Sequence, residues 1–470
     1  MNFNKKLKRL LQIIFIFTLL AVGLFFSKEF ISNYFVRINL NTLEAPGKNS
    51  RVLIFSPHND DEALSSAELI KKTIKNGGDV KVVFITNGDG FKNAIQLDYF
   101  NINPKPKDYV NFGYARQQES INALEKLGLS RKNIIFFGYP DGGISSLWNS
   151  NWDSTSPYRS SYTQTDKTPY NNSFSQGISY TGENLVSDIS KTIEDFKPTY
   201  IVMPHPNDNH PDHLSTNAFV KYTLEKINYK PEKVLLYLVH RFDWPTPMKK
   251  NITMYLVPPS KLINTGTTWS ALSLNKSDME EKIFVVHLYK TQLRTLGILM
   301  SAFERKNELF GEYDDIKLTS NKKDDKDINP DSSNKIITDP LKDAIALEIT
   351  RSADISKIYV EASKSNNLHV ILQTVGNIDD DTTYKINLIF FNGTKISKLN
   401  IEQLNNKLIS KQLSKESIIN IKGVTTEIKG NTIHIVIPKS VFRNYKSIFI
   451  NGTTFIKNRM IDKTAWRMLY

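Results

Sequence analysis

Strand-like apolar runs alternate with helical patterns from about residue 50 to about residue 310. Each of the four clearest runs is apolar at nearly every position, which is typical of a strand buried on both faces of a sheet. These runs are residues 51–56, 80–86, 133–138 and 200–205. The segments between them with a helical period are residues 61–78, 114–128 and 182–196. Such alternation predicts βαβ units and a Rossmann-like α/β layer with a largely parallel sheet and flanking helices.

The pattern changes beyond this region. Residues 313–338 are charged and rich in serine and asparagine, with little periodicity, which indicates a linker. From residue 339 onward, short alternating runs such as "LHVILQTV" and "NTIHIVIP" are separated by turn signals. They predict an antiparallel β-sandwich. We therefore expect an α/β domain over residues 48–312, the linker over 313–338 and the sandwich over 339–470.

Residues 1–30 have a different character. Basic residues precede an apolar run from Leu10 to Phe26, which as a helix spans about 26 Å and is just long enough to cross a bilayer core. The basic flank favours a cytoplasmic N-terminus, which places the rest of the chain outside. Because the residues around Phe26 are bulky and offer no small-residue cleavage site, we expect an uncleaved transmembrane anchor. The alternative is a secreted protein whose signal peptide has been removed.

Composition narrows the chemistry further. The 470 residues are 40% hydrophobic, which is enough for two or three domains with real cores. No cysteine is present, so any metal must be held by histidine and carboxylate. The net charge of +13 suits anionic polymers or lipid head groups better than nucleic acid. The lysines are spread along the chain, so a generic solvated surface explains them equally well.

Polar residues gather where the four predicted strands end. His58 follows the first strand, "TNGDG" (86–90) the second and "YPDGG" (139–143) the third, while "HPNDNHPDH" (205–213) follows the fourth. Ligand sites of open α/β sheets lie beyond the carboxyl ends of the strands. We therefore expect these residues to share one site.

Within this set, His58, Asp61 and His213 form a metal-binding pattern. His58 and Asp61 are three residues apart in a turn and can converge on one point, and His213 comes from a distant strand end. Zinc accepts imidazole nitrogen and carboxylate oxygen, and hydrolytic zinc sites use three protein ligands with one open position. A cation also explains why Asp60, Asp61 and Glu62 lie side by side, because its charge offsets their repulsion.

The neighbouring polar residues complete a hydrolytic site. Asp60 is placed to act as a general base toward water and to return the proton to a leaving amine. His210, as an imidazolium, could stabilise the oxyanion, and Asp212 could orient an imidazole. Glu62 would favour the N-terminus of the following helix.

Simpler interpretations exist for each motif alone. The Asp-Asp-Glu run is more typical of a helix N-cap, and "HPDH" of a surface turn. Their occurrence together, each at a predicted strand end, favours the site. "TNGDG" (86–90) lacks the GxGxxG spacing, which argues against a nucleotide cofactor.

The motifs "SPHNDDE" and "HPDH", in this order, resemble the zinc-dependent N-acetylglucosaminyl deacetylases of the PIG-L/LmbE-like type. The likeness covers about residues 50–310 and includes "VFITNGDG", "ARQQESINALEKLG" and "FFGYPDGG". It implies one zinc ion on His58, Asp61 and His213. It also implies Asp60 as the general base and His210 on the oxyanion side.

The resemblance adds two sugar contacts, from Arg116 and Asp141. One departure is that the family usually has proline where this chain has Asn59, a residue that lacks a fixed φ but suits turns. The C-terminal region is similar, at low specificity, to carbohydrate-binding modules of the CBM9/DOMON-like kind. The aromatic-rich insertion at 149–180 either faces a carbohydrate or packs back on its own domain.

We therefore expect a membrane-anchored, extracytoplasmic zinc amidohydrolase that removes N-acetyl groups from GlcNAc-type sugars of a surface or extracellular glycan. One alternative is a non-catalytic glycan-binding surface protein with a degenerate deacetylase domain, which Asn59 would permit. Another is a metal hydrolase acting on phosphoesters, which the scarcity of phosphate-clamping residues near the site disfavours.

Overall fold

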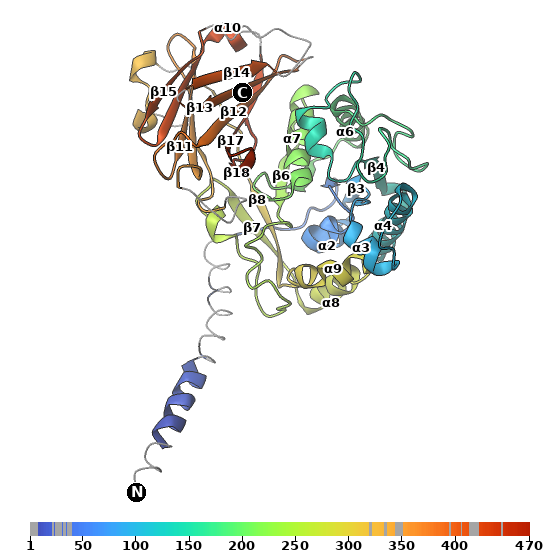
Figure 1. The fold of residues 1–470 in the computed structure, drawn as a ribbon. Helices are drawn as coiled ribbons and strands as arrows, with labels where there is room; N and C mark the ends of the chain where they lie inside the picture. The colour runs from blue at the N-terminus through green and yellow to red at the C-terminus, as the bar shows by residue number, and fades with distance from the viewer. Residues whose placement is uncertain are drawn as a thin grey trace.

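The computed structural model shows an α/β domain, a C-terminal β region and a helical segment near the N-terminus (Figure 1). The described residues are 8–20, 23, 31, 34, 40–318, 322–332, 336–343, 351–393, 396–405, 407–412, 423–442 and 445–470.

The α/β domain is built on an eight-stranded sheet with the order β1-β7-β8-β6-β5-β2-β3-β4. Its strands are β1 (Asn41–Thr42), β2 (Arg51–Ser56), β3 (Asp79–Thr86), β4 (Ile134–Tyr139), β5 (Tyr200–Pro204), β6 (Lys233–Tyr237), β7 (Thr268–Ser273) and β8 (Asn307–Glu312). The run from β6 to β4 pairs in parallel throughout, whereas β8 is antiparallel to both β6 and β7. The largely parallel core predicted from the apolar runs is confirmed.

Helices cover both faces of this sheet because alternate strand residues enter two separate cores. On β2, Val52 and Ile54 join one core, and Leu53 and Phe55 join the other. The first face is covered by α2 (Asp61–Lys75), α4 (Pro106–Lys126), α8 (Lys276–Val286) and α9 (Lys290–Ser301), with α3 (Lys92–Asp98) beside them. The second face is covered by α5 (Ile144–Asn149), α6 (Gly182–Phe196) and α7 (Pro211–Lys226).

The C-terminal region consists of two antiparallel sheets around a third core. The five-stranded sheet contains β15 (Thr425–Lys429), β16 (Thr432–Ile437), β11 (Leu368–Thr374), β10 (Ile355–Ala362) and β9 (Ile336–Thr338). The six-stranded sheet contains β14 (Lys407–Gln412), β13 (Ile396–Leu404), β12 (Thr382–Phe391), β17 (Ser447–Ile456) and β18 (Arg459–Lys463), with β19 (Arg467–Leu469) paired to β17. The predicted antiparallel β region is confirmed.

One end of the six-stranded sheet is buried on both faces. On β17, Ile448 and Ile450 enter the C-terminal core, whereas Phe449 enters the second core of the α/β domain. There it meets Trp148, whose ring also contacts Phe219. A shared hydrophobic cluster therefore joins the two parts of the chain.

The predicted membrane span lies only partly within the described residues. Residues 8–20 are helical, and large apolar side chains on them, such as Phe15 and Phe17, are exposed. The end of the predicted span, including Phe26, lies outside the described residues. Within the part of the chain that the structure describes, no helix is both long enough and apolar enough to cross a bilayer.

Candidate metal and catalytic site

The site residues stand at the carboxyl edge of the parallel strands. His58 follows β2 and Asp61 begins α2, while Asp141 follows β4. His210 caps the N-terminus of α7, which places His213 in the first turn of that helix. The loops after β2, β4 and β5, three parallel strands of one sheet, therefore deliver these side chains to one edge, as the topology of an open α/β sheet requires.

Three of these side chains meet at one point. Asp61 Oδ2 lies 3.4 Å from His58 Nδ1 and 3.1 Å from His213 Nε2. The two imidazole nitrogens are 3.3 Å apart. All three residues are buried. The residues predicted from two distant motifs thus form a compact set of nitrogen and oxygen donors.

The spacing of these donors fits a tetrahedral zinc ion. Two ligand atoms about 2.05 Å from zinc, separated by a tetrahedral angle, are about 3.3 Å from each other. The three observed separations are within about 0.2 Å of that value. Imidazole nitrogen with carboxylate oxygen is also a donor set that zinc accepts, although other divalent ions share this preference.

The protein environment fixes the charges of these donors. Burial opposes charge on Asp61, but the charge and hydrogen bond of His213, with hydrogen bonds from His240 and His58, hold its pKa well below the usual value. Burial likewise disfavours charged His213, but Asp61 and Asp208 raise its pKa to about 9. Close contacts between carboxylates and imidazoles therefore stabilise the charges that solvent would stabilise at an exposed site.

Asp60 occupies the N-cap position of α2, but its side chain makes no capping hydrogen bond. Capping therefore does not account for this carboxylate. Its backbone φ is 133°, a conformation that a non-glycine residue holds only under constraint from its surroundings. The backbone is held through Asp60 N, which donates to Glu62 Oε2, and through Asp60 O, which accepts from Leu64 N. Burial raises the pKa of Asp60 to about 6, although Arg116 opposes this change.

His210 presents one ring nitrogen for donation. Its Nδ1 accepts a hydrogen bond from Asp212 N at 3.2 Å, so a neutral ring carries its proton on Nε2. Burial and the neighbouring imidazoles of His58, His213 and His240 hold the pKa of His210 well below the usual value, which favours a neutral ring and not the imidazolium expected from the sequence. The ring centroids of His210 and His58 are 4.6 Å apart.

Asp212 and Glu62 brace the loops around the site. The carboxylate of Asp212 accepts from Gly142 N at 2.7 Å and from Ile144 N at 3.1 Å, and it lies 3.4 Å from His58 Nε2. Glu62 is fully buried, accepts from Ser56 Oγ at 3.3 Å, and also accepts from the Tyr289 hydroxyl. Glu62 stands in the first turn of α2, as predicted.

The buried side chain of Arg116 connects two loops of the site by hydrogen bonds. Its Nη1 donates to Gly88 O at 2.7 Å and its Nη2 donates to Asn59 O at 2.6 Å. A Cβ at Gly88 would lie 1.7 Å from Nη1, and φ there is +57°, so only glycine fits beside the guanidinium. The predicted sugar contact of Arg116 stays a prediction.

Asp141 lies against the candidate metal ligand His58. Its Oδ1 is 3.3 Å from His58 Nε2, and its Oδ2 accepts from Gly90 N at 2.8 Å. Burial opposes charge here, but His58 holds the pKa of Asp141 below its usual value. Its predicted sugar contact also stays a prediction.

Asn59, the residue in the family's proline position, is fully buried and donates from Nδ2 to Ser120 Oγ at 2.8 Å. This hydrogen bond attaches the site loop to α4. A side-chain contact thus restrains the loop where a proline ring would restrict φ.

Two site residues escaped the sequence reasoning. Asp208 Oδ2 lies 3.2 Å from His213 Nδ1 and also accepts from the backbone of His240. His240 follows β6, and its Nε2 lies 3.4 Å from Asp61 Oδ1. For His240 the sequence did contain a signal. The apolar run 233–237 indicates a further strand, and His240 follows its end.

Part of the aromatic insertion packs back on its own domain, while a carbohydrate contact of the insertion stays a prediction. Trp152 stacks on Phe219, and Tyr170 is buried with its hydroxyl donating to Asp89 Oδ2. Both therefore pack back on the domain. Tyr158 and Tyr162 are only half-buried. Burial raises the pKa of both hydroxyls, and neighbouring carboxylates, Asp141 among them, raise it further.

Comparison with known proteins places this geometry in a family. The family model described as PIG-L, GlcNAc-PI de-N-acetylase, matches residues 53–224. Residues 53–224 are a PIG-L domain. The matched part of the chain contains both motifs, from His58 to His213, whereas His240 and the strands from β6 to β8 lie beyond it.

Solved structures of deacetylases are similar to part of this chain. A deacetylase of the teicoplanin biosynthesis pathway has 16% identity and a TM-score of 0.38, covering 56% of this chain and 97% of its own. The N,N'-diacetylchitobiose deacetylase from Pyrococcus horikoshii has 16% identity and a TM-score of 0.32, covering 56% of this chain and 82% of its own. No curated protein sequence matches the chain. The resemblance of the C-terminal region to carbohydrate-binding modules stays a prediction.

Proposed function

We propose that this chain is a zinc-dependent N-deacetylase that removes acetyl groups from GlcNAc-type amino sugars of a cell-surface or extracellular glycan. One observation carries the proposal: two imidazole nitrogens and a carboxylate oxygen lie within 3.4 Å of one another at the carboxyl edge of a PIG-L domain. Asp60 stands beside these donors with a buried carboxylate that no helix cap uses.

His58, Asp61 and His213 would hold the zinc ion. When bound, zinc supplies the positive charge that activates water and polarises a carbonyl group. Asp208 faces the far nitrogen of His213 and so favours the tautomer whose Nε2 lone pair points to Asp61 and His58. The protein thereby orients its ligands before any substrate arrives.

Asp60 moves the proton in the proposed reaction. Its carboxylate takes one proton from the attacking water as the water oxygen bonds to the acetyl carbon. It returns that proton to the sugar nitrogen as the C–N bond breaks, which yields acetate and a free amine. Arg116 Nη2, 3.6 Å from Asp60 Oδ1, keeps the carboxylate in place.

His210 stabilises the negative charge that develops on the carbonyl oxygen. Its Nε2–H is the free donor, since Nδ1 already accepts from Asp212 N. A donor fixed at a helix N-terminus needs no rearrangement during the reaction. Tyr158 and Tyr162, half-buried near Asp141, are the aromatic faces on which a sugar ring would rest.

The proposed setting is a membrane surface with the PIG-L domain outside the cell. The exposed apolar side chains of residues 8–20 and the basic residues before them support an N-terminal anchor. The net charge of +13 suits an anionic wall polymer. Detergent dependence of extraction from membranes, lost on deletion of residues 1–30, tests this localisation.

Acetate release from a panel of GlcNAc-containing glycans, with and without a chelator, tests the activity. Asp60→Asn is expected to lower turnover about 10²- to 10⁴-fold while zinc content stays unchanged. The control is Asp79→Asn, an exposed aspartate at the opposite end of β3. Full activity of Asp60→Asn would refute the catalytic proposal.

The substrate panel separates the remaining alternatives. Release only from small soluble GlcNAc conjugates, and never from wall material, would refute the glycan substrate but leave the deacetylase intact. Glycan binding without acetate release, and unaffected by Asp60→Asn, would favour the glycan-binding protein.

A further inference from the structure

A second group of carboxylates lies outside the PIG-L site, where the C-terminal region faces the α/β domain. Asp339 directly follows β9, Asp343 stands in the next turn, and Asp462 belongs to β18. One carboxylate oxygen from each of the three lies within 4.8 Å of the others. Asp339 and Asp462 are each only 2% exposed. Segments more than a hundred residues apart thus bring three acidic groups together away from water.

The protein leaves part of this group unsatisfied. Asp462 accepts from Ile355 N and Lys463 N, but Asp339 Oδ2 and Asp343 Oδ1 are buried without a hydrogen-bond partner. A buried carboxylate oxygen without a partner costs free energy. The cluster contains two such atoms, and the hydrogen bonds to Asp462 do not compensate their negative charge. A cation bound here would compensate it.

The nearby basic side chains compensate this charge poorly. Arg241 Nη2 is 3.9 Å from Asp343 Oδ2, but its guanidinium makes closer contacts to Asp243, at 3.0 Å, and to Asn207 O, at 2.8 Å. A further aspartate, Asp354, lies next to the group and is 1% exposed. Lys463 also lines the cavity, and Lys261 faces Asp343 but lies 3.4 Å from Asp243. These cations are therefore shared among a larger number of carboxylates.

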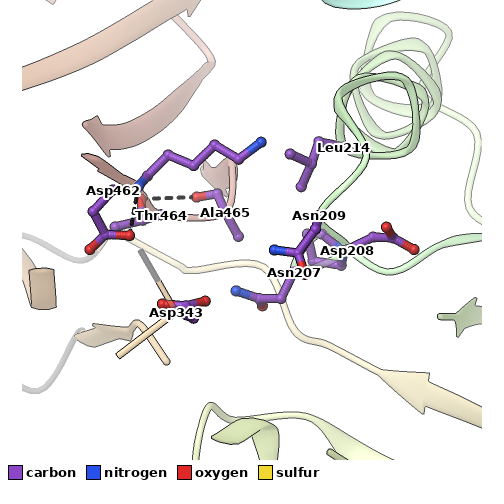
Figure 2. Close-up of a pocket in the computed structure, with 10 residues that line it drawn as sticks. Asn207, Asp208, Asn209, Leu214, Asp343, Asp462, Thr464 and Ala465 are labelled. Atoms are coloured by element: carbon purple, nitrogen blue, oxygen red, sulfur yellow. Dashed lines mark hydrogen bonds between the residues drawn. The ribbon is translucent and has the colours of Figure 1, made fainter. Parts of the chain in front are cut away.

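An independent observation comes from the opposite wall. Asn207, in the loop after β5, is 7% exposed, and its Oδ1 has no hydrogen-bond partner. It lines a cavity of ≈ 20 Å³ together with Asp343 and Asp462. Figure 2 shows the Asn207 side chain extending from the α/β domain toward Asp343. A neutral amide side chain with an unpartnered oxygen therefore lies on the opposite wall of the same cavity.

We propose that Asp339, Asp343 and Asp462, with Asn207 opposite, bind a hard divalent cation of the calcium type. Calcium takes carboxylate and amide oxygens in flexible sets of six to eight, some supplied by water. Zinc favours nitrogen or sulfur donors, which this group lacks, and magnesium demands a stricter octahedron. The cavity is large enough for about one water-sized particle.

The bound cation joins the C-terminal region to the PIG-L domain. Asn207 belongs to the same loop as Asp208 and His210, so a cation on Asn207 also steadies the loop that leads to the metal ligand His213. This role is separate from zinc binding, because the donors of the two sites are different residues.

Calcium titration of the full chain tests the proposal. The protein is passed over a chelating resin and reloaded with one equivalent of zinc, so that the histidine site is filled before calcium is added. Isothermal titration calorimetry is expected to show one calcium site. Calcium at about 100 times Kd is expected to raise Tm by about 5 °C.

Asp339→Asn and Asn207→Ala are expected to weaken calcium binding at least about tenfold, because each removes an oxygen donor or its charge. Asp381→Asn, at an exposed position of the same region, is the matched control and is expected to bind as wild type does. Without calcium, Asp339→Asn is expected to melt above wild type, since it removes one buried repulsive charge. A Tm above that of wild type in the absence of calcium would show that Asp339→Asn is folded, so its weaker calcium binding would not result from unfolding.

Two results would overturn the proposal. The first is the absence of calcium heat and of any Tm shift, which would show that Arg241 and Lys463 suffice as counter-charges. The second is calcium binding that survives Asp339→Asn and Asn207→Ala but disappears in His213→Ala, because the calcium would then be entering the histidine site.

Discussion

Replacing Phe449 by alanine tests how the two parts of the chain are held together. Phe449 is 1% exposed, and its ring centroid lies 5.5 Å from that of Trp148 and 6.2 Å from that of Tyr222. Its neighbours on β17, Ile448 and Ile450, point into the C-terminal core instead. The variant therefore removes a ring from the shared cluster and leaves the interior of the C-terminal region intact.

The magnitude follows from burial. Truncation of a fully buried phenylalanine costs about 3–5 kcal/mol, and each edge-to-face ring pair contributes about 0.5–1.5 kcal/mol beyond the area term. Trp148 also packs on Phe219 of α7, so the surrounding rings have little freedom to collapse into the gap. We expect a loss near the middle of that range, about 4 kcal/mol.

Calorimetry and urea unfolding measure the effect. Wild type is expected to unfold with the two parts coupled, and Phe449→Ala is expected to separate the C-terminal transition from that of the PIG-L domain. The control is Ile450→Ala, which is expected to destabilise the C-terminal region by about 2–5 kcal/mol without separating the transitions further. A Phe449→Ala loss below about 1 kcal/mol, with one unchanged transition, would refute this account of the interface.

Two further variants test single contacts. Asp208→Asn removes the charge that faces His213 Nδ1. It is expected to lower zinc affinity about 10- to 100-fold, measured by competition with a fluorescent chelator. Unchanged affinity would contradict the proposed role of Asp208 in orienting His213. Lys398 is buried, which lowers its pKa to about 7, and it donates to the carbonyls of Trp148 and Asn149. Because the unfolded chain binds this proton more tightly, stability should rise from about pH 7 to pH 10, on the order of 1 kcal/mol per pH unit, relative to Lys398→Met. Parallel urea midpoints for both proteins over that range would contradict the linkage.

The strands of the α/β domain could be predicted closely because their environment is uniform. A strand buried on both faces is apolar at every position, so β2, at 51–56, was predicted with its observed limits, and β3 to β5 to within one residue. The end of β12 shows the same effect: "LIFF" is continuously apolar because Leu388 and Phe390 enter one core while Ile389 and Phe391 enter another.

The start of α4 was predicted too late, for a physical reason. The helix begins at Pro106, not at residue 114, and Gly113 lies inside it. A Cβ at Gly113 would lie 2.1 Å from the Tyr170 hydroxyl, so this glycine permits a close approach and does not mark a helix end. Contacts with a distant insertion cannot be read from local periodicity.

The part of the candidate site that could be predicted from the sequence is the part whose two motifs follow strands of one parallel sheet. His58, Asp61 and His213 could be grouped because strand ends of a parallel sheet share one edge. His240 stands alone after β6, and Asp208 lies among six other polar residues in the stretch 205–213, so neither has a spacing that marks it. Their proximity to Asp61 and His213 depends on side-chain direction, which only the folded structure provides.

The two hydrogen bonds of Arg116 have a consequence for how metal enters and leaves. The guanidinium ties the carbonyls of Asn59 and Gly88, and Asn59 is tied in turn to Ser120, so protein groups alone set the course of the loop. Small metal-folded domains lose their structure when stripped, because metal binding is their folding energy. Here hydrogen bonds between protein groups hold the loop, so under the proposed function ion exchange would be a reversible local event that switches turnover off and on without denaturing the chain.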